Sequence, residues 1–348
     1  MTAELAQQQG FTRAERQDFA RRRILLPAAL LVSVLLLYAN LLFLSLASPT
    51  LISAALTVPC GMAIGMLFII GHDACHNAFT ASTRLNRLIG RLSFLPALHS
   101  FSLWDLAHNR THHRYNNIRG VDYVWEPMTL DEYRGTPWAR RVVYRFCRAP
   151  IGVAFYYLIH IWAPRLVLPL PGFIERLRPV YALDSMLVLT FLPLQLWSIV
   201  AIGETFDKGP WESLLLGVAV PFLIWSGFMS FAIYLHHTHP AVKWYSSLAE
   251  WTADRGALQG AVAVRFPWPF GPLVLSIMEH NAHHLSPGVP LYNLSCLQRA
   301  LEEQGNLVTW RFTWRAYRRV CRRCKLYDYV AGRWASFDSR PCSNGPSQ

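Results

Sequence analysis

Charged side chains are scarce in this sequence: they make up only 16% of its 348 residues, whereas 53% are apolar. A soluble globular domain carries about 25% charged residues, so the composition argues against an ordinary soluble protein. Acidic residues are the scarcest, 21 against 33 basic ones, which gives a net charge of +12. A basic excess can indicate a nucleic-acid partner. Here the arginines flank apolar segments, as on the cytoplasmic side of membrane proteins, and we expect no nucleic-acid partner.

The sequence also lacks a disulfide framework. Its seven cysteines are odd in number and scattered, as in proteins whose thiols face the reducing cytosol. Cys321 and Cys324 have zinc-knuckle spacing, but only Cys342 follows them, so we do not expect a zinc or rubredoxin-like site there. No Gly-rich phosphate loop and no carboxylate nucleophile motif is evident, which argues against phosphoryl transfer and hydrolysis.

Long apolar runs are plentiful, and about twenty apolar residues span a bilayer as a helix. We predict four membrane spans, at residues 24–47, 51–70, 183–203 and 212–235. The first run is too long for a cleaved signal peptide. The short turns between spans one and two and between spans three and four predict two hairpins.

Arginine placement predicts the orientation of these hairpins. Residues 72–182 hold fourteen arginines, whereas the connector of residues 204–211 has Lys208 as its single basic residue. The positive-inside rule then places both termini and the middle region in the cytoplasm. We expect a cytosolic N-terminal segment (1–23), a membrane domain (24–337) and a C-terminal tail (338–348).

Two stretches between the hairpins, residues 85–106 and 142–168, are amphipathic and are expected in part to lie on the membrane surface. They contain His99 and His160, which are isolated from other histidines. We interpret both as core or interfacial residues rather than metal ligands.

Three histidine clusters are the most informative feature: His72-Asp-Ala-Cys-His76, His108-Asn-Arg-Thr-His112-His113 and His280-Asn-Ala-His283-His284. Residues i and i+4 share one face of a helix, so each cluster is expected to present its histidines together, and neutral imidazole is a common ligand of transition metals. One such cluster is more often structural than functional. Three clusters on the same predicted membrane face indicate one shared metal site.

Eight imidazoles exceed the needs of one ion and divide naturally between two. A ninth candidate lies in the segment His236-His237-Thr-His239, in which we favour His237. Ligand histidines are oriented by acceptors behind them, and the nearby candidates are Asp73, Asp105, Asp122, Asn109 and Asn281. A two-metal site beside a bilayer suits oxygen activation and removal of hydrogen from a lipid chain.

The three clusters resemble the histidine boxes of the integral-membrane fatty acid desaturases. Further stretches resemble the Δ12/ω3 acyl-lipid desaturases in particular. They are Tyr234–Ala241, Glu250-Trp with Arg255-Gly-Ala-Leu, Asp122 with Trp125 and Pro127, and Cys324–Asp328 with Trp334. The resemblance covers roughly residues 24–337.

This resemblance implies an all-α integral membrane protein of four transmembrane helices with a cytosolic helical cap. It implies two non-haem iron ions, and O2-dependent introduction of a cis double bond into an acyl chain of a membrane lipid. The ligands it implies are His72, His76, His108, His112, His113, His237, His280, His283 and His284. The sequence has no His-Pro-Gly-Gly haem motif, so the electrons are expected from a separate, ferredoxin-like donor.

The second box departs from the plant Δ12 pattern, because three residues instead of two precede its histidine pair. The boxes alone leave alternatives open. Hydroxylation of a lipid, or ketolation or hydroxylation of a carotenoid, begins with the same hydrogen abstraction. A non-enzymatic metal-binding membrane protein is a further alternative, although transport sites usually place ionisable residues within the spans.

Overall fold

The computed structural model describes residues 11–338 except 255, 269 and 306. Four helical segments are long and apolar enough to cross a membrane. They are α3 (Leu25–Ala47), α4 (Thr50–Cys75), α12 (Pro179–Glu204), and the continuous run of α13 (Pro210–Leu214), the π-helix η3 (Leu215–Ala219) and α14 (Val220–His237). The predicted all-α membrane fold with four spans is confirmed.

The helices extend beyond the predicted spans, most notably in α4. The apolar run ends near residue 70, but the helix continues to Cys75 because the polar residues His72 and Asp73 are buried by the rest of the protein. Pro59 lies inside α4, where a transmembrane helix tolerates it because neighbouring groups satisfy the freed backbone.

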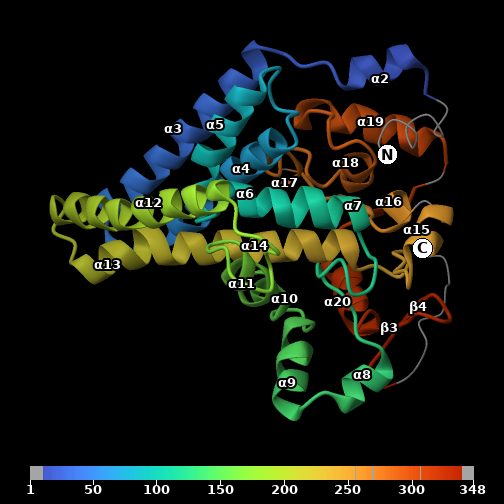
Figure 1. The fold of residues 1–348 in the computed structure, drawn as a ribbon. Helices are drawn as coiled ribbons and strands as arrows, with labels where there is room; N and C mark the ends of the chain where they lie inside the picture. Colours follow the sequence, from blue (N-terminus) through green and yellow to red (C-terminus); the bar gives the residue numbers. More distant parts are fainter. Residues whose placement is uncertain (1–10, 255, 269, 306, 339–348) are drawn as a thin grey trace.

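Helices α4 and α14 form the centre of the bundle (Figure 1). Their closest approach is at Gly61, where a Cβ atom would lie 2.7 Å from the side chain of Ile224. Helices α3 and α12 lie outside them and expose large apolar side chains such as Leu36 and Trp197, which is typical of a lipid-facing surface. Because α4 and α14 end on the same side, His72 and His237 are brought together there.

The cap consists of short elements from the middle and the C-terminal part of the chain. The middle part contains α5 (Thr83–Phe94), α6 (Phe101–Trp104), η1 (Asp105–His112), α7 (His113–Tyr115), α8 (Leu130–Gly135), α9 (Trp138–Cys147), α10 (Val153–Tyr156), η2 (Tyr157–Trp162) and α11 (Ala163–Arg165). The C-terminal part contains α15 (Leu248–Ala253), α16 (Gly256–Gln259), α17 (Phe270–Leu273), α18 (His280–Leu285), α19 (Leu291–Glu303) and α20 (Trp314–Arg323). Helix α2 (Arg13–Phe19) packs on α19.

Two small strand pairs join this cap, and the sequence interpretation did not include them. Strands β1 (Ala263–Arg265) and β2 (Thr309–Arg311) pair in parallel. Strands β3 (Leu326–Asp328) and β4 (Arg333–Ala335) pair antiparallel. The fold remains helical in class.

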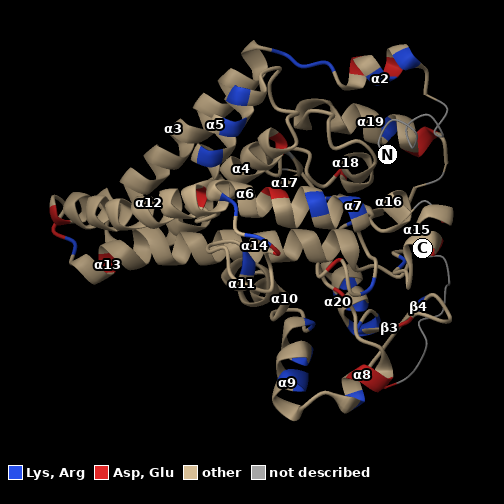
Figure 2. Ribbon diagram, viewed as in Figure 1, with Lys and Arg blue, Asp and Glu red and all other residues tan. Residues whose placement is uncertain are grey.

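Charged residues follow this division of the molecule (Figure 2). Lys and Arg are seen on α5, α7, α9 and α20, whereas the middle stretches of α12 and α14 carry neither sign. Helix α9 exposes Trp138 and Val142 together with Arg140 and Arg145. This mixture is typical of a helix on a membrane surface.

The isolated histidines and the cysteine pair have structural surroundings. His99 is buried, and its ring nitrogens contact the Ala97 carbonyl and the Tyr157 hydroxyl, both at 2.6 Å. His160 is partly buried against the ring of Tyr156. Cys321 and Cys324 are buried in the main hydrophobic core; Cys342 lies outside the described residues.

Candidate metal centre

The nine predicted histidines converge into two groups within the described residues, one of five and one of four side chains. The first histidine group contains His72, His76, His108, His113 and His283; the second contains His112, His237, His280 and His284. In each group one candidate ligand atom per residue lies within 4.8 Å of all the others. The geometry therefore unites residues that are more than two hundred positions apart.

The second box is not an α-helix with three histidines on one face, and this part of the prediction was wrong. Residues Asp105–His112 form a π-helix, in which residues i and i+5 rather than i+4 are neighbours. His108 and His113 therefore point into the first group, with 3.0 Å between their Nε2 atoms, whereas His112 points into the second. The box has one residue more than the plant pattern. A π-turn is a way for a helix to accommodate such an extra residue.

Distances between the imidazoles fit a shared ion. The Nε2 atoms of His72 and His108 are 2.7 Å apart, and that of His280 is 3.0 Å from His237 and 3.1 Å from His284. Two nitrogens bound at about 2.1 Å and at right angles on one ion are about 3.0 Å apart. Neutral rings that all direct lone pairs at one point repel each other unless a cation lies between them. The residues present therefore fit two metal ions.

Burial keeps these rings neutral and leaves some of their nitrogens without a protein partner. Burial lowers the pKa of His76 to about 3, and it lowers the pKa of His108, His113, His280, His283 and His284 well below the usual value. The Nε2 atoms of His76 and His283 are buried without a hydrogen-bond partner among the described residues. A buried polar atom without a partner is costly, and metal coordination would remove that cost.

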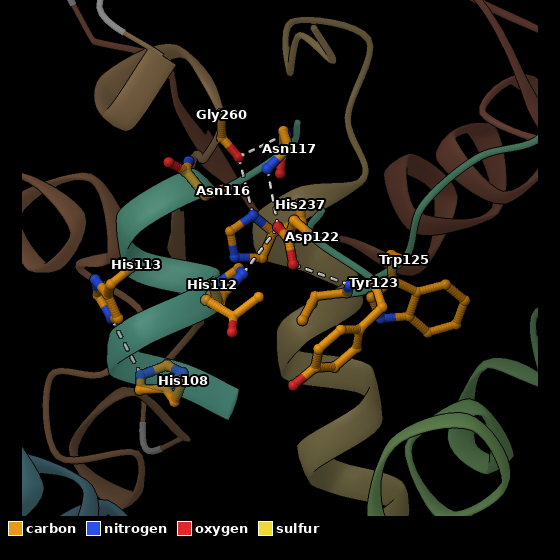
Figure 3. A network of polar contacts seen from close by, with 12 residues as sticks. His108, His112, His113, Asn116, Asn117, Asp122, Tyr123, Trp125, His237 and Gly260 are labelled. Atoms are coloured by element: carbon orange, nitrogen blue, oxygen red, sulfur yellow. Dashed lines mark hydrogen bonds and ion pairs between the residues drawn. The ribbon is translucent and has the colours of Figure 1, made fainter. Parts of the chain in front are cut away.

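Asp122 orients His112 from behind (Figure 3). The Nδ1–H of His112 donates to the Asp122 Oδ2 at 2.9 Å, which leaves the Nε2 lone pair free for a metal. The same oxygen accepts from the backbone N–H of Asn117 at 2.8 Å, and Oδ1 accepts from that of Val124 at 3.0 Å. Of the five predicted orienting residues, Asp122 is the one that contacts a histidine ring.

The other four predicted residues position the backbone instead. Asp73 accepts from the Leu291 N–H, and Asn281 donates to the carbonyls of Leu258 and Ala261. Asp105 accepts from Asn109, whose amide also donates to the Cys75 carbonyl. These bonds hold the helices that carry the boxes in place without fixing the tautomer of a ring.

Sequence reasoning missed the group that orients His237. Its Nδ1–H donates to the carbonyl of Gly260 at 2.9 Å, and this carbonyl also accepts from the side chain of Asn117 at 3.0 Å (Figure 3). A Cβ atom at position 260 would lie 2.3 Å from Asn116, so glycine permits this close approach. A backbone carbonyl has no signature in the sequence.

His236, in the fourth span, and His239, just after it, lie outside both groups, whereas His237 belongs to the second; its role as a ligand stays a prediction. His236 stacks on the ring of His280 with 3.8 Å between centroids, and its Nε2 faces the Met278 sulfur at 3.2 Å. His239 packs near Trp310.

An apolar cavity is lined both by residues of the membrane helices and by histidines of both groups. The histidines are His72 and His108 of the first group and His112, His237 and His280 of the second. The rest of its lining is mostly apolar and comes from α4, η1, η2, α14 and adjacent loops: Gly65, Phe68, Ile69, Trp104, Ala107, Tyr123, Val124, Tyr157, Ile161, Trp225, Phe228, Met229, Ala232, Ile233, His236 and Ile277. We call this space the metal-side cavity.

Comparison with known proteins identifies this combination of boxes and cavity. A sequence model of the fatty acid desaturase family matches residues 48–316. The chain belongs to the fatty acid desaturase family. The match begins just before α4 and includes all nine histidines, so the desaturase resemblance noted in the sequence is confirmed. The outer bounds predicted for the desaturase domain, 24 and 337, stay predictions.

Individual relatives agree with this desaturase assignment. The chain is 28% identical over 274 residues to the sn-1 oleoyl-lipid 12-desaturase of Synechocystis sp., an alignment that covers 77% of this chain and 74% of the relative. It is 28% identical to the chloroplastic omega-6 fatty acid desaturase of Glycine max, covering 84% and 66% of the two chains. It is 30% identical to an sn-1 acyl-lipid omega-3 desaturase (ferredoxin) of Nostoc sp., covering 66% and 61%.

These comparisons assign the chain to the desaturases, which are oxidoreductases. The hydroxylase and carotenoid alternatives, and a metal-binding protein without activity, are not favoured. The alignments leave a quarter to two fifths of these three relatives without a counterpart in this chain.

Proposed function

We propose that this desaturase introduces a cis double bond into an acyl chain of a membrane lipid, using O2 and two iron ions. The observation that carries the proposal is the metal-side cavity, whose lining is mostly apolar and includes histidines of both groups. An acyl chain matches such a lining. The printed names of the relatives, which are acyl-lipid desaturases, support the same substrate class.

The nine histidines are the proposed iron ligands, five in the first group and four in the second. Bound there, iron supplies the O2 chemistry needed to remove hydrogen from an unactivated carbon. The residues of the chain do the rest. Asp122 and the Gly260 carbonyl hold His112 and His237 as Nδ1–H tautomers, and buried side chains such as Trp104, Val124 and Trp225 exclude water from the reacting carbon atoms.

Electrons are proposed to arrive from a small acidic, ferredoxin-like protein. The exposed arginines Arg110 and Arg114 lie on the same continuous helix as His108, His112 and His113. These arginines neighbour the proposed ligands in the chain, so a donor docked on them would lie near those ligands. Complementary charge accelerates such encounters and makes them sensitive to salt. A reduction rate that stayed constant between low and high salt would refute this docking site.

The orientation that we propose places both termini and the histidine groups in the cytoplasm. The support is the arginine content of residues 72–182, compared with Lys208 alone in the connector between α12 and α13. Cysteines introduced singly at the exposed residues Asp207 and Asp131 distinguish the two faces. A membrane-impermeant maleimide added to intact cells should label the first and not the second.

Expression in a host without polyunsaturated fatty acids tests the function. Gas chromatography of total lipids should show a new unsaturated acyl chain, and the purified protein should contain about two irons per chain. The His112→Ala variant should lose the product and part of the iron. His239→Ala is the matched control, because His239 is buried but lies outside both groups, and it should retain the iron. A hydroxylated or ketolated product, or full activity of His112→Ala, would overturn the proposal.

A further inference from the structure

A second apolar pocket lies on the membrane side of the protein, next to the metal-side cavity. Its lining comes from the membrane helices α4 and α14, the loop before box three and the segment before α20: Met62, Phe228, Phe231, Phe266, Pro267, Phe270, Val274, Phe312 and Trp314. We call it the lipid-side pocket. Phe228 is the residue that lines both spaces, so its side chain forms part of the wall between them.

The packing of α4 against α14 explains why an opening exists at this level. At Gly61 the two helices are in close contact, since a Cβ there would lie 2.7 Å from Ile224 and from the Pro221 carbonyl. One turn further along α4, at Gly65, a Cβ would meet Trp225 at 3.5 Å and Phe228 at 3.9 Å, which is ordinary contact. The contact with α14 is therefore looser at Gly65 than at Gly61, and at Gly65 it is made by the side chains of Trp225 and Phe228.

The rim of the lipid-side pocket has the composition of a membrane interface. Trp314 is 67% exposed, Phe270 is 57% exposed, and Trp268 beside them in the loop is 85% exposed. Aromatic side chains of this kind gather where acyl chains meet head groups. The lining contains three membrane-helix positions, Met62 of α4 and Phe228 and Phe231 of α14, so the pocket faces bilayer lipid.

Positive charge lies beside the same rim. Arg311 and Arg315 flank Phe312 and Trp314 in the chain, and both are exposed. No ion pair involves either of them in the part of the chain that the structure describes. Guanidinium groups bind phosphate oxygens well. An acyl chain that entered here would leave its head group beside these arginines.

We propose that the lipid-side pocket is the port through which the acyl chain of a bilayer phospholipid enters the metal-side cavity, with Phe228 as the gate and Arg311 and Arg315 as the phosphate site. The proposal rests on the proposed function and deepens it by naming the route and the carrier. It predicts a phosphodiester-linked acyl chain as substrate rather than a free fatty acid.

Filling the port tests the route. Met62→Trp fills the lipid-side pocket without changing the lining of the metal-side cavity, and Leu223→Trp is the matched control on the exposed lipid face of α14. The full chain is reconstituted in phosphatidylcholine vesicles with a phosphatidylglycerol that carries a mid-chain diazirine. After photolysis, mass spectrometry should find labels on residues of the metal-side cavity in the wild type. The labelling should fall at least tenfold in Met62→Trp and stay unchanged in Leu223→Trp.

A second pair of measurements tests the gate and the carrier. Phe228→Ala should increase the labelling rate. Arg311→Gln with Arg315→Gln should decrease labelling by the phospholipid probe, by about fivefold for each arginine, and leave labelling by a diazirine fatty acid unchanged. Equal labelling of Met62→Trp and wild type would overturn the port, and equal loss with both probes would overturn the phosphate site. Labelled cavity residues without any double-bond formation would instead contradict the proposed function.

Discussion

Replacing Asp122 by asparagine tests whether a single carboxylate orients the ring of His112. Both oxygens of Asp122 accept hydrogen bonds: Oδ2 from His112 and Asn117, and Oδ1 from Val124. An asparagine has one acceptor oxygen, so its NH2 group must face at least one of these N–H donors. Either His112 loses its acceptor or a backbone N–H in the loop after box two does.

The size of the effect follows from these bonds. A hydrogen bond to a charged group contributes about 1.5–3 kcal/mol, compared with about 0.5–1.5 kcal/mol for a neutral one. Loss of a group behind a metal ligand typically weakens metal binding by about 10–100-fold. We therefore expect Asp122→Asn to bind iron in the second histidine group about 10–100-fold more weakly, with a smaller effect on the first group, because His112 belongs to the second.

Chelator competition on the purified protein measures this change without reference to activity. Iron per chain is determined after equilibration with a series of chelator concentrations, for the wild type and the variant. Asp73→Asn is the control: Asp73 is also a buried carboxylate close to the boxes, but it accepts from the Leu291 N–H and contacts no histidine ring. If Asp122→Asn and Asp73→Asn released iron at the same chelator concentration as the wild type, the role assigned to Asp122 would be wrong.

Three further predictions concern the same site. His283→Ala should lower iron binding in the first group, whereas His236→Ala should leave the iron content unchanged because its ring lies outside both groups; metal analysis decides. Gly260→Ala should lower the free energy of unfolding by about 1–3 kcal/mol through overpacking against Asn116, whereas Gly288→Ala, with open space around it, should not; thermal unfolding in detergent compares them. Removal of metal from the wild type should lower the unfolding temperature, since a ligand at about a thousand times its Kd contributes about 4 kcal/mol; an unchanged temperature would contradict metal binding by the folded state.

The convergence of the nine histidines could be predicted because spacing and residue type carry that signal; their role as iron ligands stays a prediction. Three clusters on one predicted membrane face pointed to one site, and the structure brings all nine side chains together. The division into groups could not be predicted, because it depends on backbone geometry. With α-helical geometry His108 and His112 would share a face; the π-helix Asp105–His112 turns them into different groups.

Features that depend on backbone atoms or on short segments could not be predicted from the sequence either. The Gly260 carbonyl that orients His237 is a group that every residue has. Strands β1 and β2 are three residues each and pair across more than forty positions. They are too short to show the alternation of apolar and polar residues from which a strand is predicted. The extension of α4 beyond residue 70 depends on burial of His72 and Asp73 by the cap, which a hydropathy pattern of the helix alone does not contain.

Assembly of the site depends on the membrane helices and the cap at the same time. The first group takes His72 from α4 and His76 from its C-cap, His108 from η1, His113 from α7 and His283 from α18; the second takes His112 from η1, His237 from α14, and His280 and His284 from α18. Boxes two and three each contribute to both groups, so neither group can form while one of these boxes is undocked. Bound metal would therefore stabilise the docking of the cap on α4 and α14. The same docking brings five of the nine histidines into the lining of the metal-side cavity, so a cavity lined by both groups exists only in the assembled state.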